Sequence, residues 1–244
     1  MKKIAVISCW WNEEKLAKLF LKAHDYADKI FILMADDATD RSREIALANK
    51  KVVIESLNMP NGFDDQIKID AINTKARSFV GKFDWVVSMD SDEFPNPDIR
   101  SRIDGAKLNE LFNVEFYTLY RHRTEKEFDP DGELSQRQHG VWMWTKPCVL
   151  AVKNNMEWTT GCHCVNNSKM FQCPTGIIKG GHWNSASPEI AIDRRIRGRR
   201  DRMSQVNIEK TWGSYNYNVT EQQIIDECNI HLDDPLEIQA WSNK

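Results

Sequence analysis

The sequence of 244 residues lacks any long apolar run and any strong excess of one charge. No stretch approaches the roughly 20 apolar residues that a membrane-spanning helix needs. The net charge of −3 excludes a global electrostatic attraction to nucleic acid or anionic membranes, so any such attraction has to be local. With 41% hydrophobic and 28% charged residues, the composition is that of a soluble globular protein.

The N-terminal segment lacks the pattern of a signal peptide. Residues 1–7 have a charged end but only a short apolar stretch, which Ser8 interrupts and the polar residues 12–14 close. No small-residue cleavage site follows. This stretch is typical of a buried strand, and we expect a cytoplasmic protein.

The six cysteines are too few for a disulfide scaffold in a chain of this length, so reduced thiols are expected. One cluster, Cys162-His163-Cys164 with Cys173 beyond it, suggests zinc. Structural zinc sites, however, usually separate paired cysteines by two to four residues. The spacing therefore disfavours a zinc site.

The first hundred residues alternate between predicted strands and helices. Apolar runs rich in β-branched residues predict strands at residues 3–9, 30–34, 52–54 and 85–89. Helical spacing predicts helices capped by Asn12 and by Thr39 or Asp40, and a third helix over residues 64–80. The alternation predicts an α/β fold with a largely parallel sheet, in which ligands bind beyond the carboxyl ends of the strands.

The second half is predicted to be mixed. Longer strands, some of them antiparallel, are expected at residues 114–120 and 141–152, and a strand or loop at residues 176–181. Helices are expected at residues 188–206 and 220–228. No internal repeat or linker divides the chain, so we expect a single domain over residues 1–244.

Two aspartates, in Asp90-Ser91-Asp92, directly follow the last strand of the first half. Carboxylates in such a position repel each other and lose hydration unless a cation or hydrogen-bond donors compensate them. Mg²⁺ and Mn²⁺ favour oxygen ligands and bridge to phosphates. A solvated acidic turn is the alternative. The metal interpretation is favoured because the polar residues 10–13 and 36–40 end other strands at the same sheet edge.

These three clusters resemble motifs of glycosyltransferase family 2 and its family 92-like relatives. The motifs are Ile7-Ser8-Cys9-Trp10-Trp11-Asn12-Glu13-Glu14, Asp36-Asp37-Ala38-Thr39-Asp40-Arg41-Ser42 and Asp90-Ser91-Asp92-Glu93-Phe94. The family has Tyr-Asn-Glu-Glu, an Asp/Ser/Thr/Asp turn and Asp-x-Asp-Glu-Phe in the same order. Trp11 replaces the usual tyrosine, and the aspartate turn is one residue shorter than the commonest form. The resemblance implies the GT-A fold, with the nucleotide-sugar-binding half at residues 1–100 and the acceptor half at residues 101–244.

The resemblance also implies how a nucleotide-sugar donor is held. The donor-binding residues that it implies are Trp10, Trp11, Glu13, Asp36, Asp37 and Asp90, with either Asp36 or Asp37 as the residue that meets the base. Asp92 is implied to bind Mn²⁺ or Mg²⁺, and Asp90 to contact the ribose or a metal-bound water. An aromatic ring at position 11 suits stacking on a base.

A second resemblance lies in residues 181–189 and the basic residues 194–198 that follow. They are similar to the family's His-aromatic-x-x-x-Ser segment and basic helix, in which the histidine completes the metal site. His182 is therefore expected to join Asp90 and Asp92 as a ligand. A structural histidine in a glycine-flanked turn is the alternative interpretation.

Six arginines between Arg194 and Arg202 make the most basic stretch of the chain. On a helix they would face several directions, so most are expected to lie on a solvated surface. Arg194 or Arg195 is expected to clamp the donor diphosphate, because a guanidinium matches phosphate oxygens bidentately. Two interpretations stay open for the others: a paired surface, or contacts with a polyanionic or nucleic-acid acceptor.

A catalytic base is the least defined part of the predicted site. An inverting transfer needs a carboxylate that takes the proton of the acceptor hydroxyl, and we expect it in the second half. Glu157 is the favoured residue. The other candidates are Asp129, Asp131 and Glu133, with His139 and His163 as weaker ones.

The predicted function is metal-dependent transfer of a sugar from a nucleoside-diphosphate sugar, UDP-linked by expectation, to an unknown hydroxyl acceptor. The cation would stabilise charge on the departing diphosphate, and inversion is implied by the resemblance. One alternative is a non-catalytic protein that binds a nucleotide or sugar. Another is a sugar nucleotidyltransferase, which would normally have a glycine-rich loop with Lys or Arg after the first strand. Residues 10–13 are not such a loop.

Overall fold

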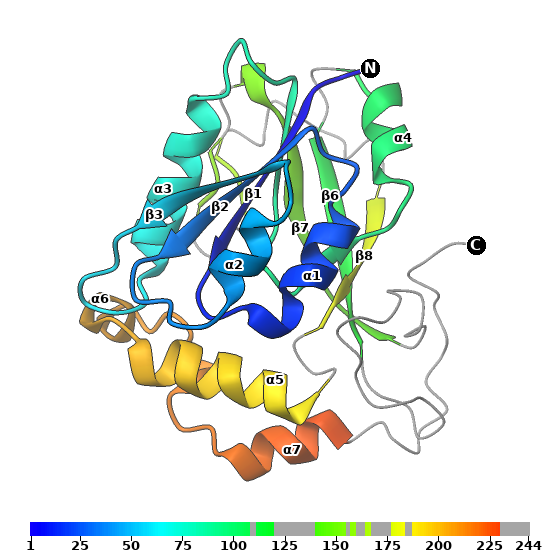
Figure 1. Ribbon diagram of the computed structural model, residues 1–244. Helices are drawn as coiled ribbons and strands as arrows, with labels where there is room; N and C mark the ends of the chain where they lie inside the picture. Colours follow the sequence, from blue (N-terminus) through cyan, green and yellow to red (C-terminus); the bar gives the residue numbers. More distant parts are fainter. Residues whose placement is uncertain are drawn as a thin grey trace.

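The computed structural model places one mixed sheet at the centre of the molecule (Figure 1). It describes residues 1–107, 111–119, 140–154, 157–159, 164–166, 177–183 and 187–229. Within these residues the strand order is β3-β2-β1-β4-β7-β6-β8-β5. The parallel part of the sheet consists of β1 (Ile4–Trp10), β2 (Lys29–Ala35), β3 (Val52–Leu57) and β4 (Trp85–Ser88).

The other half of the sheet is mixed, as the sequence predicts. The strand β7 (Gly140–Ala151) runs antiparallel to β4 and to β6 (Leu111–Leu119). The strand β8 (Ile177–His182) lies parallel to β6 and antiparallel to β5 (Glu93–Pro95). The predicted α/β fold with a largely parallel first half and a mixed second half is confirmed, and this strand arrangement is consistent with a GT-A-like fold.

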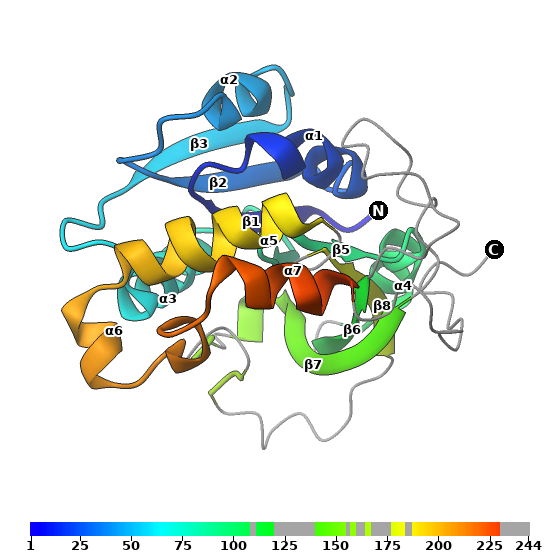
Figure 2. The same cartoon turned by 90° about the horizontal axis from the view of Figure 1, so that it is seen from below.

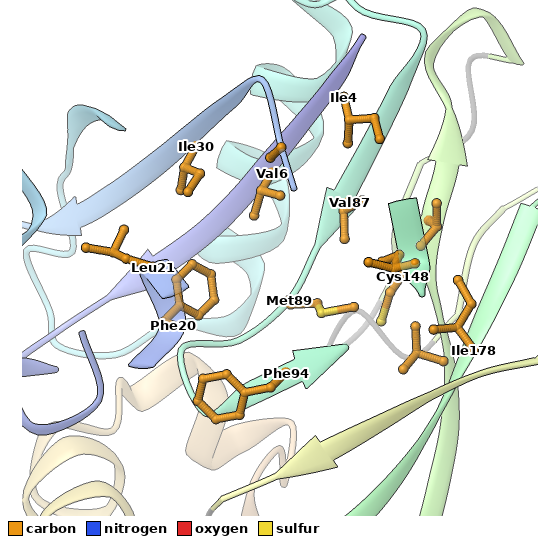
Figure 3. Close-up of a cluster of buried hydrophobic side chains, with 14 of the residues drawn as sticks. Ile4, Val6, Phe20, Leu21, Ile30, Val87, Met89, Phe94, Cys148 and Ile178 are labelled. Atoms are coloured by element: carbon orange, nitrogen blue, oxygen red, sulfur yellow. The ribbon is translucent and has the colours of Figure 1, made fainter. Parts of the chain in front are cut away.

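Helices cover both faces of the sheet. One face packs against α1 (Glu14–Ala23), α2 (Ser42–Leu47) and α4 (Ile99–Gly105), and the other packs against α3 (Asp65–Arg77). Side chains of β1 alternate between these layers, as a strand requires: Val6 joins the first cluster and Ile7 the second. Figure 3 shows part of the first cluster, with Phe20 of α1 close to the strands.

Two of the predicted helix caps are wrong. Asn12 does not cap α1, because it has a positive φ of 50° and its side chain accepts N–H bonds from Thr39 and Asp40. The N-cap position of α2 is Arg41, although Asp40 does accept the Ser42 N–H at 3.0 Å. The side chain of Asn12 thus ties the end of the first strand to the turn after the second strand.

Helix α3 does begin where predicted, and so does α7 (Glu221–Asn229). Asp64 caps α3 by accepting the backbone N–H groups of Gln66 and Ile67. At α7, Thr220 and Gln223 satisfy each other's backbone N–H groups in a capping box. Within the described residues, no helix is long and apolar enough to cross a membrane.

The predicted helix over residues 188–206 is divided into shorter pieces. It consists of α5 (Pro188–Ile192), the π-helical η5 (Asp193–Arg199), the 3₁₀-helical η6 (Arg200–Arg202) and α6 (Gln205–Glu209). Among the described residues, the other short 3₁₀ helices are η2 (Val152–Asn154) and η7 (Ser214–Asn216). We call residues 193–202 the arginine segment. It continues α5 past the carboxyl ends of the parallel strands (Figures 1 and 2).

A buried histidine should make the stability of the fold depend on pH. His24 is fully buried, its ring stacks on Phe20 at 4.0 Å between centroids, and burial lowers its pKa to about 4 from 6.5. The unfolded chain therefore binds the proton more readily between these two values. The free energy of unfolding should therefore decrease by about 3 kcal/mol as the pH falls from 6.5 towards 4.

Urea unfolding of the chain at several pH values in this window measures the loss. His24→Phe is the matched control, because it keeps an aromatic ring against Phe20 but cannot titrate. An equal loss of stability in the variant and in the wild type would contradict the assignment to His24.

Candidate functional site

A pocket lies at the carboxyl ends of β1, β2 and β3, below the arginine segment. Its lining includes Trp10, Trp11, Glu13, Asp90 and Arg194, all of which the sequence nominated. Residues from α3 and from the arginine segment complete the wall. The cavity is small, at ≈ 80 Å³, because the arginine segment lies against the strand ends.

Arg194 lies at the centre of a buried charge network. Its Nη1 donates to Glu13 at 2.6 Å and to Ser91 at 2.9 Å, and its Nη2 lies 3.0 Å from Asp92. His182 Nε2 lies 3.1 Å from the other oxygen of Asp92. Burial alone would raise the pKa of Asp92, but Arg194 and His182 hold it well below its usual range. Asp92 is therefore a carboxylate anion in the folded protein.

Asp90 belongs to a neighbouring network of lysines. Lys68 Nζ donates to Asp90 at 2.6 Å, and Lys146 Nζ lies 3.5 Å from the other oxygen of Asp90. Lys146 also pairs with Glu93 at 2.6 Å, and both of these side chains are only 1% exposed. Burial opposes ionisation of Asp90, yet the two lysines keep its pKa well below normal. The sequence did not nominate either lysine.

Asp92 and His182 fit as two ligands of one divalent cation. Adjacent ligands of an octahedral ion with bonds of about 2.1 Å lie about 3 Å apart, and the carboxylate oxygen and imidazole nitrogen are 3.1 Å apart. Asp90 does not join them, because its oxygens face Lys68 and Lys146. In the described part of the chain no three His, Cys, Asp or Glu side chains form a metal-binding group. The structure thus brings Asp92 and His182 together, and it places Asp90 in the neighbouring lysine network.

The two tryptophans of the first motif have different environments. Trp10 is 1% exposed, its Nε1 donates to Ser8, and its ring packs edge-on against Phe20. The Trp10 ring is therefore part of the core, although the residue is among those that line the pocket. Trp11 is only partly buried and lines the pocket. Its indole N–H is buried and has no hydrogen-bond partner among the described residues.

The arginine segment covers the ring of Trp11. The Arg202 guanidinium lies 4.2 Å from the ring centroid and binds both oxygens of Asp37, at 2.9 and 2.7 Å. Gly198 also approaches the ring, since a Cβ at that position would lie 3.3 Å from it. A base that stacks on this face of Trp11 must therefore displace Arg202.

Two other expected site residues are directed away from the pocket. Asp36 is exposed and accepts a hydrogen bond from Ser56. Arg195 points to α7, where it pairs with Glu227. Neither residue lines the pocket. In this structure each side chain is directed to a neighbouring element instead.

Glu157, the favoured catalytic base, also lies elsewhere. It pairs with Arg77 and accepts a hydrogen bond from Asn166. Arg77 is the last residue of α3, nine residues beyond Lys68, which corresponds to about 14 Å along a helix. The weaker candidate Asp129 lies outside the described residues, as do Asp131, Glu133, His139, His163, Cys162 and Cys173.

Most arginines of the arginine segment have carboxylate partners. The pairs are Arg194 with Glu13 and Asp92, Arg195 with Glu227, Arg197 with Asp193, Arg200 with Asp201, and Arg202 with Asp37. Among the described residues, no carboxylate lies within ion-pair distance of Arg199. The segment therefore offers little uncompensated positive charge to a polyanionic acceptor.

The sheet order and the pocket at its carboxyl edge are those of a mixed α/β protein and are consistent with a GT-A-like fold. No family model and no curated protein matches the chain. Similar solved structures include glucosyl-3-phosphoglycerate synthase from Mycobacterium tuberculosis in complex with Mn²⁺, UDP and phosphoglyceric acid. The identity is 18% and the TM-score 0.36, over 48% of this chain and 43% of that chain.

Two further solved structures show comparable similarity. The 4-diphosphocytidyl-2C-methyl-D-erythritol synthase from Anaerococcus prevotii has 11% identity and a TM-score of 0.38, over 63% of this chain and 71% of its own. A mycobacterial protein has 17% identity and a TM-score of 0.34, over 48% and 41%. The chain thus spans less than half the length of the first and third structures. Similarities this low do not assign a reaction to the chain.

Proposed function

We propose that the chain is a glycosyltransferase that moves a sugar from a nucleoside-diphosphate sugar, UDP-linked by expectation, to a hydroxyl acceptor. The observation that carries the proposal is the buried Asp92 carboxylate, which lies between His182 and Arg194 beside a pocket at the sheet edge. A desolvated anion next to an imidazole suits a cation, and a cation with vacant positions suits a diphosphate.

Each charged residue has a defined part in this proposal. Asp92 and His182 would hold Mn²⁺ or Mg²⁺, which supplies positive charge to the departing diphosphate. Arg194 fixes the orientation of Asp92 and adds a second positive charge. Lys68 keeps Asp90 ionised, so that the oxygens of Asp90 remain hydrogen-bond acceptors for the ribose hydroxyls.

Two carboxylates of the site, Asp90 and Asp92, are unsuited to act as the catalytic base. Asp90 pairs with Lys68 and Asp92 with Arg194, and these cations hold the pKa of each carboxyl well below its usual range, whereas a general base needs a pKa near the working pH. Glu13 also pairs with Arg194, but burial raises its pKa. Asp129, outside the described residues, remains a candidate for the base.

A panel of nucleotide sugars with Mn²⁺, measured by thermal shift and by donor hydrolysis, tests the proposal. We expect one donor class both to stabilise the chain and to be hydrolysed slowly. Binding without turnover in the presence of any acceptor would instead indicate a binding protein. Release of pyrophosphate from a nucleoside triphosphate and a sugar phosphate would indicate a nucleotidyltransferase.

A substitution of Trp11 tests the base-binding part of the proposal. Stacking of a base on an aromatic ring contributes roughly 1–3 kcal/mol, so Trp11→Ala should weaken binding of the nucleotide about tenfold or more. Trp212→Ala is the matched control: its ring also contacts a cation, Lys210, at 4.4 Å, but it does not line the pocket. Equal affinities of the two variants would exclude Trp11 as the base platform.

A further inference from the structure

Arg199 differs from the other arginines of the arginine segment in its partners. Its Nη1 donates to the hydroxyl of Tyr215 at 3.2 Å, and its guanidinium lies 5.3 Å from the ring centroid of Phe63. Both contacts are with uncharged groups. The side chain lines the same pocket as Asp90 and Arg194.

The contacts of Arg199 leave hydrogen-bond donors of its guanidinium available to an anion. Arg199 is partly buried, and a guanidinium has five N–H donors, of which the bond to Tyr215 uses one. Burial by itself lowers the pKa of Arg199, but Tyr215, Asp65 and Asp90 more than offset this, so the side chain stays charged.

Arg194 cannot take the same role without giving up existing bonds. Its guanidinium already binds Glu13, Ser91 and Asp92. An incoming phosphate would compete with two carboxylates for it. Arg199 can form bonds to a phosphate without breaking an ion pair, because it has none within the described residues.

We propose that Arg199 forms a phosphate-binding subsite in this pocket. The class of ligand is a compact phosphate anion, which the planar guanidinium can bind through two parallel hydrogen bonds. Tyr215 acts as a positioning residue that orients the guanidinium. The identity of the natural ligand rests on the proposed function, in which this anion is the diphosphate of the donor.

Calorimetric titration of the full chain with inorganic pyrophosphate, at fixed low salt and without divalent metal, tests the subsite. Arg199→Ala should lower the affinity at least tenfold. Arg199→Lys should recover part of it, because the charge remains but the fork is lost. Arg200→Ala is the matched control: it removes the same charge from the next residue, whose partners are Asp201 and the Val219 carbonyl. Its affinity should stay within about twofold of the wild type.

The outcomes separate the subsite from the proposed function. Equal losses in Arg199→Ala and Arg200→Ala, or no binding of pyrophosphate by the wild type, would overturn the subsite. Pyrophosphate binding that depends on Arg199, in a chain that binds no nucleotide sugar, would support the subsite and refute the proposed donor. Nucleotide-sugar binding that is unchanged in Arg199→Ala would support the proposed donor and refute the subsite. If Arg199→Ala fails to fold, the pyrophosphate affinities of Arg199→Lys and Tyr215→Phe are compared with that of Arg200→Ala instead.

Discussion

Asp92→Asn should remove Mn²⁺-dependent binding of UDP or a UDP-sugar, with a loss of affinity of about a hundredfold or more, or at least about 2.7 kcal/mol. The substitution takes away the anionic oxygen that lies 3.1 Å from His182. It also leaves Arg194 with a single carboxylate partner, Glu13. Calorimetry with UDP in the presence and absence of Mn²⁺ measures the effect directly.

Asp36→Asn is the matched control for this experiment. Asp36 belongs to the second motif, but it is exposed and its carboxylate binds Ser56 rather than a cation. Its substitution should leave Mn²⁺-dependent affinity within about twofold of the wild type. Because Asp92 is 3% exposed, circular dichroism and urea unfolding must show that the Asp92 variant is folded. Unchanged Mn²⁺-dependent affinity in folded Asp92→Asn would refute the metal assignment.

The position of the pocket could be predicted because it depends on backbone topology. Parallel strands place their carboxyl ends at one edge, so the residues after β1, β2 and β4 had to meet there. Trp11, Asp37 and Asp90 do lie around the carboxyl ends of these strands. The role of each side chain at that edge was less predictable, because it depends on contacts that the motifs do not specify.

The two buried lysines illustrate what the sequence could not show. Lys68 interrupts the apolar pattern of a helix and Lys146 that of a strand, and a lysine at such a position is ordinarily a solvated one. Each is buried here because a carboxylate from another element, Asp90 or Glu93, lies within reach. The acidic residues from Asp90 to Glu93 did indicate that positive charge lies nearby. From the sequence alone, a metal ion was the simplest source of that charge.

The broken helix over residues 188–206 has a similar tertiary cause. Phe63 N–H donates to the carbonyl of Arg202, and Ser204 N–H donates to the carbonyl of Phe63. These bonds replace helical ones and join the end of the arginine segment to the loop before α3. Gly62 makes this approach possible, because its φ of 89° suits glycine and a Cβ there would collide with the Arg202 carbonyl. Helical periodicity alone carries no information about such a contact.

Lys146→Met should destabilise the fold by about 3–5 kcal/mol, because it leaves the fully buried Glu93 carboxylate without its cation. Lys146 and Glu93 lie 2.6 Å apart, and each side chain is 1% exposed. Burial already raises the pKa of Glu93 in the presence of the lysine. Without Lys146, the folded state should bind a proton there, so the loss measured by urea unfolding should become smaller as the pH is lowered.

The double variant Lys146→Met/Glu93→Gln isolates the cost of the unpaired charge. Glutamine keeps a carbonyl oxygen that can accept the Asp90 N–H, which Glu93 accepts at 2.8 Å, but it carries no charge. The double variant should therefore be more stable than Lys146→Met alone by about 2 kcal/mol or more, and the single variant Glu93→Gln completes the double-mutant cycle that measures the coupling between the two residues. Asp90 retains Lys68 in both variants, so its own ion pair at 2.6 Å does not confound the comparison. If Glu93→Gln fails to rescue Lys146→Met, packing of the lysine stem rather than charge compensation explains why this strand buries a lysine.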